Sequence, residues 1–362
     1  MKKLSLILTV ILLIMLAACS TARQKLSPQG NVNLKTADVY YSQQNVDQAE
    51  IYYLKVLEDN PEHIIALRRL GDINLFKAEN FTAKEIDYYK DAYQYYSRAI
   101  SVCEQFSELT DQERIDLKDM KKRKERAWTR IFLAANKEKE AGNTKRAMEI
   151  YELAHQLEPE RPEPMIQLKN IYLVDLKDDV KAEQLLLQLL QKDPQKIDYL
   201  MELGTYYYTK GNYAEAVKYF EQARPQIPTN IDNLMNISAC YYELKDYTKA
   251  MAATNAALEI EPNNPDLLEN ARSIADQIND IDQSIAYLKR LIQIRPTEET
   301  YSLLAGHLMQ KQNWSELIKY AEEWYNWDKN SKIAVEYIIW AAQQSGDKIL
   351  ATKYNDIKKT MP

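Results

Sequence analysis

The sequence has 362 residues, of which 46% are apolar and 28% are charged, and its formal net charge is −6. This length exceeds one ordinary globular domain unless the chain is a repeat array, and the negative charge disfavours non-specific binding to nucleic acid. The 7 glycines and 12 prolines fall far below the roughly 12% of residues that these two types make up in an average protein. Few helix breakers, with abundant Ala, Leu, Glu, Lys and Tyr, predict an all-helical chain.

The chain starts with a leader. Two lysines precede an apolar run, residues 4–18, which is too short to span a bilayer comfortably. The run ends in L-A-A-C, residues 16–19, which resembles the bacterial lipobox. The resemblance implies that residues 1–18 are a signal peptide removed before Cys19, and that Cys19 carries a diacylglycerol and usually an N-acyl chain. The alternative is a secretory signal followed by a chance cysteine.

Residues 19–29 are interpreted as a lipidated tether, because the polar stretch from Ser20 to Asn33 shows no apolar period. Two or three acyl chains attach a protein stably to a membrane. The expected location is therefore the bacterial cell envelope, with a lipid anchor. Ser20 after the cysteine resembles the outer-membrane sorting choice, which applies if the cell is Gram-negative. Loss of the two leader lysines changes the net charge from −6 to about −8.

Prolines recur at nearly constant intervals along the rest of the chain. Pro159, Pro194, Pro228, Pro262 and Pro296 are separated by 35, 34, 34 and 34 residues. Alanines stand twelve residues before four of them, at Ala147, Ala182, Ala216 and Ala250. A period of this length is the sequence signature of a repeat architecture.

One period, residues 197–230, shows the full pattern. Positions 8, 11, 20, 24, 27 and 32 hold Gly204, Tyr207, Ala216, Phe220, Ala223 and Pro228. This pattern resembles the tetratricopeptide repeat, a helix–turn–helix unit of 34 residues. The resemblance implies an all-α solenoid of helical hairpins, a right-handed superhelix of about eight repeats with a C-terminal capping helix pair.

The repeat pattern divides the chain. N-terminal repeats with an extended insertion occupy residues 30–108, a charged helical extension 109–127, the central array 128–332, and degenerate capping helices 333–362. Six glycines have a role in this scheme. Gly71, Gly204 and Gly306 are assigned to position 8, where two helices approach closely, and Gly142, Gly211 and Gly346 to the turn between the helices.

The insertion contains two capping-box patterns, which predict two long helices at about 82–107 and 111–141. We expect these helices to form a protruding hairpin. The second carries the basic stretch K-K-R-K at residues 121–124. This stretch is interpreted as a solvated helix face, with contact to lipid phosphates or an acidic partner as the alternative.

In the family, positions 2, 5, 9 and 12 of each first helix line the concave face; we refer to these positions as the A-helix face. In two adjacent repeats they hold Asp198, Met201, Thr205 and Tyr208, then Asp232, Met235, Ala239 and Tyr242. Packing is not expected to require the methionines and tyrosines. Such side chains beside carboxylates suit a partly apolar, basic protein or peptide partner. The alternative is that they pack against the neighbouring helix.

The family's carboxylate clamp for chaperone peptides is absent. Its slots here hold Met201, Thr205, Asn236, Asp266 and Asn270, of which only one agrees with the clamp pattern.

Motifs for catalysis or cofactors are not found. The three histidines, His63, His155 and His307, lie far apart in the array, and no H-E-x-x-H, G-x-S-x-G or phosphate-binding glycine loop occurs. Cys103 and Cys240 are expected to be structural. The sequence therefore predicts no metal, no cofactor and no enzyme activity.

Together these features predict a membrane-anchored scaffold that binds a protein or peptide partner in its concave groove and does not bind nucleic acid. Envelope assembly or the regulation of an envelope enzyme is the expected setting. The alternative is a surface lipoprotein that binds glycan or nutrient. Four tryptophans would then supply rings for stacking on sugars, although they could simply close the terminal core: Trp314, Trp324, Trp327 and Trp340.

Overall fold

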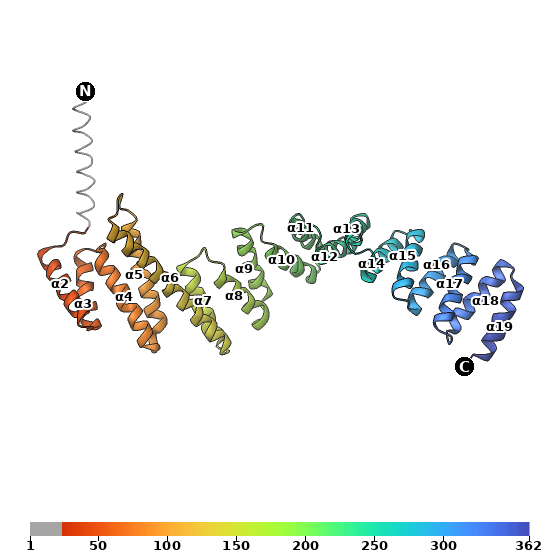
Figure 1. Ribbon diagram of the computed structural model, residues 1–362, viewed down its shortest axis with the longest axis horizontal. Helices are drawn as coiled ribbons and strands as arrows, with labels where there is room; N and C mark the ends of the chain where they lie inside the picture. The colour runs from red at the N-terminus through yellow and green to blue at the C-terminus, as the bar shows by residue number, and fades with distance from the viewer. Residues whose placement is uncertain (1–23, 362) are drawn as a thin grey trace, which may run out of the picture. The chain divides into compact units, whose positions relative to one another are not determined.

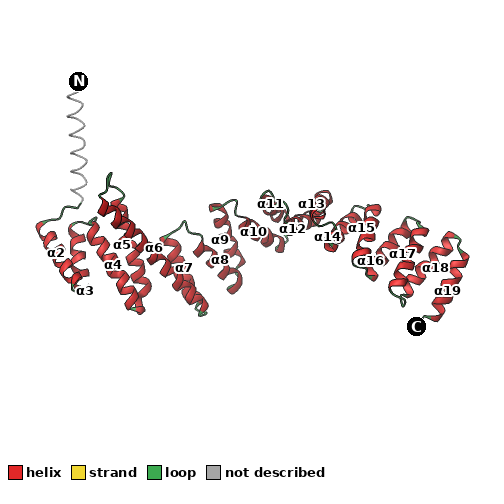
Figure 2. Cartoon of the chain, in the orientation of Figure 1, coloured by secondary structure: helices red, strands yellow, loops and turns green. Residues whose placement is uncertain are grey.

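The computed structural model describes residues 24–361, and the regular secondary structure in that range is helical throughout (Figure 2). The chain divides into an N-terminal body, residues 24–185, and a C-terminal body, residues 186–361. Within each body, successive helices form antiparallel hairpins that stack side by side (Figure 1). The predicted all-α helical-hairpin solenoid is confirmed. The predicted signal peptide and Cys19 lie outside the described residues.

The N-terminal body contains the longer and less regular helices. They are α2 (Pro28–Ser42), α3 (Val46–Asp59), α4 (Ile64–Asn80), the 3-10 turn η1 (Thr82–Lys84), α5 (Glu85–Cys103), α6 (Asp111–Glu140), α7 (Thr144–Leu157), α8 (Glu163–Asn170) and the π-helical turn η2 (Ile171–Asp175). Helix α9 (Asp179–Lys192) crosses the boundary between the bodies.

The C-terminal body is built of helices of nearly equal length. They are α10 (Ile197–Thr209), α11 (Tyr213–Ala223), α12 (Ile231–Glu243), α13 (Tyr247–Ile260), α14 (Pro265–Gln277), α15 (Ile281–Ile294), α16 (Glu298–Gln310), α17 (Trp314–Trp327), α18 (Lys332–Ser345) and α19 (Lys348–Thr360). The last hairpin, α18 with α19, occupies the segment interpreted as capping helices. None of the helices in residues 24–361 combines the length and apolar character needed to cross a bilayer.

The repeat positions pack as the sequence predicts. Ala216, Phe220 and Ala223 are fully buried. A Cβ atom on Gly204 would lie 2.5 Å from the Phe220 ring, and one on Gly71 would lie 2.7 Å from the Tyr96 ring. Only glycine allows this approach, because a methyl group at such a distance overlaps the ring.

The turn between the two helices of a repeat contains a residue with positive φ. Glycine takes this conformation without strain, and Gly142, Gly211 and Gly346 have φ of 79°, 74° and 81°. Other repeats place a larger residue in the same conformation, at Gln44, Lys177, Lys245, Asn279 and Gln312. These residues therefore mark the register of each repeat independently of the prolines.

This register corrects the role assigned to Gly306. The loop between α15 and α16 spans residues 295–297 and is one residue shorter than the loop 261–264 of the preceding repeat. The last central repeat therefore begins at residue 298, not 299, and buried Ala305 occupies position 8. Nothing lies within 4 Å of a Cβ built on Gly306, so its expected role in close helix approach is wrong.

The repeat at residues 162–196 is one residue longer than its neighbours, and the helix absorbs the extra residue. The Leu176 N–H donates to the Ile171 carbonyl at 3.0 Å, an i to i+5 bond that defines the π turn η2. An insertion in a helix is commonly accommodated as such a bulge.

Helices α5 and α6 pack against each other as expected, but they do not protrude from the stack, and that part of the expectation is wrong. Ion pairs tie the first half of α6 to α4: Arg68 of α4 pairs with Asp116 at 2.7 Å, and Arg123 of α6 reaches Asp72 of α4 at 3.0 Å. The second half of α6 pairs with α7, where the Trp128 indole donates to the Ala154 carbonyl at 2.9 Å. Helix α6 therefore contacts both the preceding hairpin, which contains α4, and the following helix α7.

The repeat body also begins earlier than predicted, because residues 24–29 are not simply tether. The Gln24 side chain accepts from the Ile64 N–H at 3.0 Å, and the Ser27 N–H donates to Asp59 at 2.8 Å. Ser27 then caps α2, which starts at Pro28. These bonds fix the entry of the chain beside the first turn of α4.

Candidate partner-binding face

The predicted groove residues lie on α10 and α12, and they fall into two classes. Asp198, Asp232 and Thr205 are exposed. The other four are half-buried: Met201, Tyr208, Met235 and Tyr242. Met201 packs beside the core that contains Phe220, and Met235 beside the core of the next hairpin. The methionines therefore belong partly to the core, as the packing alternative proposed.

The tyrosines at position 12 each contact the first tyrosine of the second helix. The rings of Tyr208 and Tyr213 meet edge to face at 5.2 Å, and those of Tyr242 and Tyr247 at 5.5 Å. Such pairs add stabilisation beyond the burial of area. The expectation that packing does not require these tyrosines is therefore wrong. Burial also raises the pKa of Tyr208, so its hydroxyl stays protonated at neutral pH.

A cavity of about 180 Å³ opens between α12 and α14. Tyr242 lines it, and its hydroxyl lies 3.3 Å from the Ser273 hydroxyl. The remaining lining residues are Ser238, Ala239, Glu243, Asn270 and Ile274. Asn270 was named in the sequence analysis only as a slot of the absent carboxylate clamp, and Ser273 was not named. Extending the position-9 column by one repeat, from Ala239 to Ser273, would have found Ser273.

The hydrogen bonding of position 9 on the A-helix face differs between the two bodies. In the N-terminal body the tyrosine at position 24 donates to position 9 in each of three hairpins. The pairs are Tyr53 with Asp38 at 2.6 Å, Tyr96 with Asp72 at 2.7 Å, and Tyr151 with Asn136 at 2.6 Å. In the C-terminal body position 24 holds Phe220, Thr254 and Leu288. None of these carries a phenol, and Thr254 bonds Ser238 at position 8 instead.

The A-helix face of α10, α12 and α14 is acidic. Its twelve positions carry five carboxylates and no lysine or arginine: Asp198, Asp232, Asp266, Glu269 and Asp276. Four of these carboxylates already have a cationic partner: Arg272 lies between Glu269 and Asp276, Lys196 pairs with Asp198 at 3.8 Å, and Arg295 pairs with Asp266 at 3.3 Å. Asp232 makes no ion pair within residues 24–361, so it is the carboxylate best placed to attract a cationic ligand.

Two family models, both described as tetratricopeptide repeat, match the chain. One covers residues 207–271, and the other covers residues 34–99 and 181–231. These stretches include hairpins of both bodies, and they contain the glycine, alanine and aromatic positions described above. The chain contains tetratricopeptide repeats in both bodies.

Solved structures similar to the chain are also repeat proteins. They include MamA from Desulfovibrio magneticus RS-1, which is 15% identical over 47% of this chain and 96% of its own, with a TM-score of 0.39. YrrB, titled a TPR protein with an unusual peptide-binding site, is 18% identical over 50% and 90%, with a TM-score of 0.40. PilW, titled a type IV pilus biogenesis factor, is 17% identical over 57% and 95%, with a TM-score of 0.36. No curated protein matches the chain.

The tryptophans of the last tetratricopeptide repeats are mainly core residues. Trp324 is buried and stacks on Tyr301 at 5.7 Å, and Trp314 meets Trp340 edge to face at 4.9 Å. Trp327 alone among these four is exposed, at 51%. A sugar-binding surface stacks its ligand on exposed rings, so the arrangement favours the core interpretation.

The thiols and histidines are placed for structure. Burial raises the pKa of Cys103 to about 11 and that of Cys240 to about 12, so both are protonated at neutral pH. His63 caps α4, with Nδ1 accepting from the Ala66 N–H at 3.3 Å. Within residues 24–361, groups of three or more His, Cys, Asp or Glu side chains arranged to hold a metal are not found.

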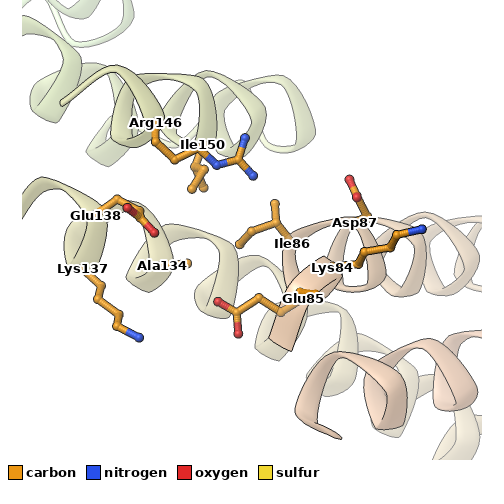
Figure 3. A pocket seen from close by; sticks show the side chains of 10 residues that line it. Lys84, Glu85, Ile86, Asp87, Ala134, Lys137, Glu138, Arg146 and Ile150 are labelled. Atoms are coloured by element: carbon orange, nitrogen blue, oxygen red, sulfur yellow. The ribbon is translucent and has the colours of Figure 1, made fainter. Parts of the chain in front are cut away.

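A second cleft, of about 210 Å³, lies between α5, α6 and α7 (Figure 3). Ile86 of α5 and Ile150 of α7 lie at its centre. Six charged side chains surround them: Lys84, Glu85, Asp87, Lys137, Glu138 and Arg146. Three are cationic and three anionic, so the cleft has no net charge that would favour a charged ligand.

Proposed function

We propose that this protein is an interaction scaffold whose C-terminal A-helix face binds a protein or peptide segment. The observation that carries the proposal is the hydrogen bonding of position 9. Where position 24 is tyrosine, its hydroxyl donates to the position-9 side chain. On α10, α12 and α14, position 9 holds Thr205, Ala239 and Ser273, which receive no hydrogen bond from position 24 because no tyrosine stands there.

The chemistry of this face defines the partner. Exposed carboxylates stand at position 2 of three successive repeats; Asp232 is unpaired within residues 24–361, whereas a lysine or arginine of the partner would exchange with Lys196 at Asp198 and with Arg295 at Asp266. The cavity beside Tyr242 accepts one side chain, with Ser273 and Asn270 as hydrogen-bonding groups. Aromatic rings and methionine thioethers adapt to apolar side chains. The partner is therefore a basic segment with apolar residues, and the role of this chain is binding, not catalysis.

We further propose that the protein is anchored in the bacterial envelope through lipidated Cys19, in the outer membrane if the cell is Gram-negative. The L-A-A-C tetrapeptide after a short apolar run supports this. A scaffold held at a membrane meets its partner at a high local concentration. Envelope assembly or the regulation of an envelope enzyme would use such a scaffold.

Selection from a random peptide display library on the full chain tests the binding proposal. We expect enriched peptides that carry Lys or Arg beside apolar residues, and loss of their capture by the double variant Tyr208→Ala, Tyr242→Ala. Tyr40→Ala is the matched control, because Tyr40 is a half-buried tyrosine that stacks on Tyr52 in the N-terminal body. Capture that survives the double variant, with helicity unchanged by circular dichroism, would refute the assignment of the face.

Metabolic labelling with a radioactive fatty acid tests the anchor. The natural chain should incorporate label and fractionate with membranes, whereas Cys19→Ala should do neither. Label that persists in the variant would show that Cys19 is not the lipidated residue.

A further inference from the structure

Acidic and basic side chains lie on different sides of the first half of α6. Asp116 and Asp119 face α4, where Arg68 pairs with both, at 2.7 Å and 3.4 Å. Four basic side chains face solvent. We refer to Arg114, Lys118, Lys121 and Lys122 as the α6 basic face; all four are exposed.

The acidic residues that flank the K-K-R-K stretch in the sequence neutralise only part of this face. Lys118 and Lys122 make no ion pair within residues 24–361, while Lys121 pairs with Glu104 and Arg114 with Asp111. The α6 basic face, with Leu117 and Glu125, lines an open depression of about 490 Å³. Glu125 is itself held by Arg161.

An apolar residue accompanies the cations. Ile115 is 61% exposed at the start of the same helix, one residue after Arg114. Exposed apolar side chains beside lysines are typical of surfaces that bind at a membrane interface, where the ammonium groups meet phosphates and the apolar group enters the acyl boundary. An acidic protein would satisfy the lysines but would leave Ile115 without an explanation.

The start of the described chain lies at the same end of the N-terminal body. Gln24 is bonded to Glu62 and Ile64 at the start of α4, and Arg68, one turn later, holds Asp116 of α6. Figure 1 shows the start of α2 and the loop before α6 at one edge of this body. Only residues 19–23 separate Gln24 from the apolar run, and five residues extend at most about 18 Å.

We propose that the α6 basic face binds the phosphate headgroups of an anionic membrane. This rests on the proposed Cys19 anchor for where the face operates, because a membrane within about 18 Å of Gln24 is within reach of α6. The electrostatic attraction falls off over about 10 Å in salt, so the contact requires the N-terminal body to approach the membrane more closely than the fully extended tether would place it. The contact would hold the N-terminal body against the membrane, which the lipid anchor alone does not do.

Vesicle flotation tests the proposal without the anchor. A chain that begins at Ser20 keeps every described residue, and the hydrophobic cores of both bodies and the hydrogen bonds of Gln24 lie within it. We expect it to float with vesicles of equal parts phosphatidylcholine and phosphatidylglycerol at low salt, and not with phosphatidylcholine alone. Lys118→Glu with Lys122→Glu should lower the bound fraction roughly tenfold or more. Lys118→Ala with Lys122→Ala should give an intermediate loss.

The matched control is Lys332→Glu with Lys348→Glu, the same charge change at exposed lysines of the C-terminal body, which should bind like the unaltered chain. Failure to float with the anionic vesicles, or equal loss in the control, would overturn the proposal. So would a photo-crosslinker at Lys122 of the full chain that captures a protein and no lipid in native membranes. Capture of peptides by the C-terminal face is measured separately, so either proposal can fail alone.

Discussion

In the N-terminal body, tyrosines at position 24 reach from the second helix to the A-helix face, as Tyr96 does to Asp72 at 2.7 Å. In the C-terminal body, Phe220 fills the same position with no polar group. Both side chains are fully buried and both contact a glycine at position 8. The packing role is therefore shared, and only the hydroxyl differs between the two bodies.

The hydroxyl determines whether the side chain at position 9 is already hydrogen-bonded within its own repeat. An acid or amide at position 9 that accepts a hydrogen bond from the core belongs to the fold, and its loss leaves a buried donor unsatisfied. A position 9 without that bond is available to a partner. Under the proposed function, exchanging a phenylalanine ring for its hydroxylated counterpart separates a stretch of the array that uses position 9 for stability from one that uses it for binding.

The sharpest test of this comparison replaces position 9 in each body. Asp72 is nearly buried and accepts from Tyr96, Arg123, Arg69 and Tyr41. Asp72→Ala should cost about 3 kcal/mol, because it leaves these donors without their acceptor. Thr205→Ala, at the same position in the C-terminal body, should change stability by less than about 0.5 kcal/mol. Hydrogen exchange followed by mass spectrometry would report each local opening energy, and equal costs would break the comparison.

A glycine pair tests the corrected register. Gly204→Ala places a methyl against the Phe220 ring and should destabilise the C-terminal body by about 1–2 kcal/mol, even after the gain in helix propensity. Gly306→Ala meets nothing within 4 Å and should stabilise it by up to about 1 kcal/mol. Denaturant titration followed by circular dichroism measures both. A destabilising Gly306→Ala would return that residue to position 8.

The smallest expected effect is the pH dependence of stability that arises from His63, the N-cap of α4. His63 accepts a hydrogen bond at Nδ1, and burial lowers its pKa below the ordinary 6.5. The unfolded chain therefore binds the proton first, and stability should fall as pH drops below about 6.5. The equivalent cap on α12, Asn230, does not titrate. His63→Asn should remove up to about 1 kcal/mol of the pH dependence, measured by thermal unfolding between neutral and mildly acidic pH. An unchanged slope would show that the cap does not depend on neutral His63.

The fold could be predicted because the core residues recur at the same positions in each repeat. Departures were harder to predict, since a single residue can be lost from a loop, as before α16, or absorbed in a π turn, as in η2, without a local signal. The long helix α6 was predicted, but its attachment to α4 depends on ion pairs between residues about fifty positions apart.

The candidate face was predicted in part for a similar reason. Its column of acids is visible in the sequence, because it repeats every 34 residues. The edge-to-face contacts of Tyr208 and Tyr242 were missed, since they depend on the angle between two helices. The same holds for the cavity at Ser273, which is formed by side chains of two helices, α12 and α14.

Site-specific photo-crosslinking in the native envelope tests the central claim most directly. A photoreactive amino acid is placed at position 2 in both bodies of the full chain, at Asp198 or Asp232 and at Asn31 or Ile65, all of which are exposed. We predict a discrete protein adduct from residues 198 and 232 and none from residues 31 and 65. Adducts from residues 31 and 65 alone would contradict the assignment of binding to the C-terminal A-helix face.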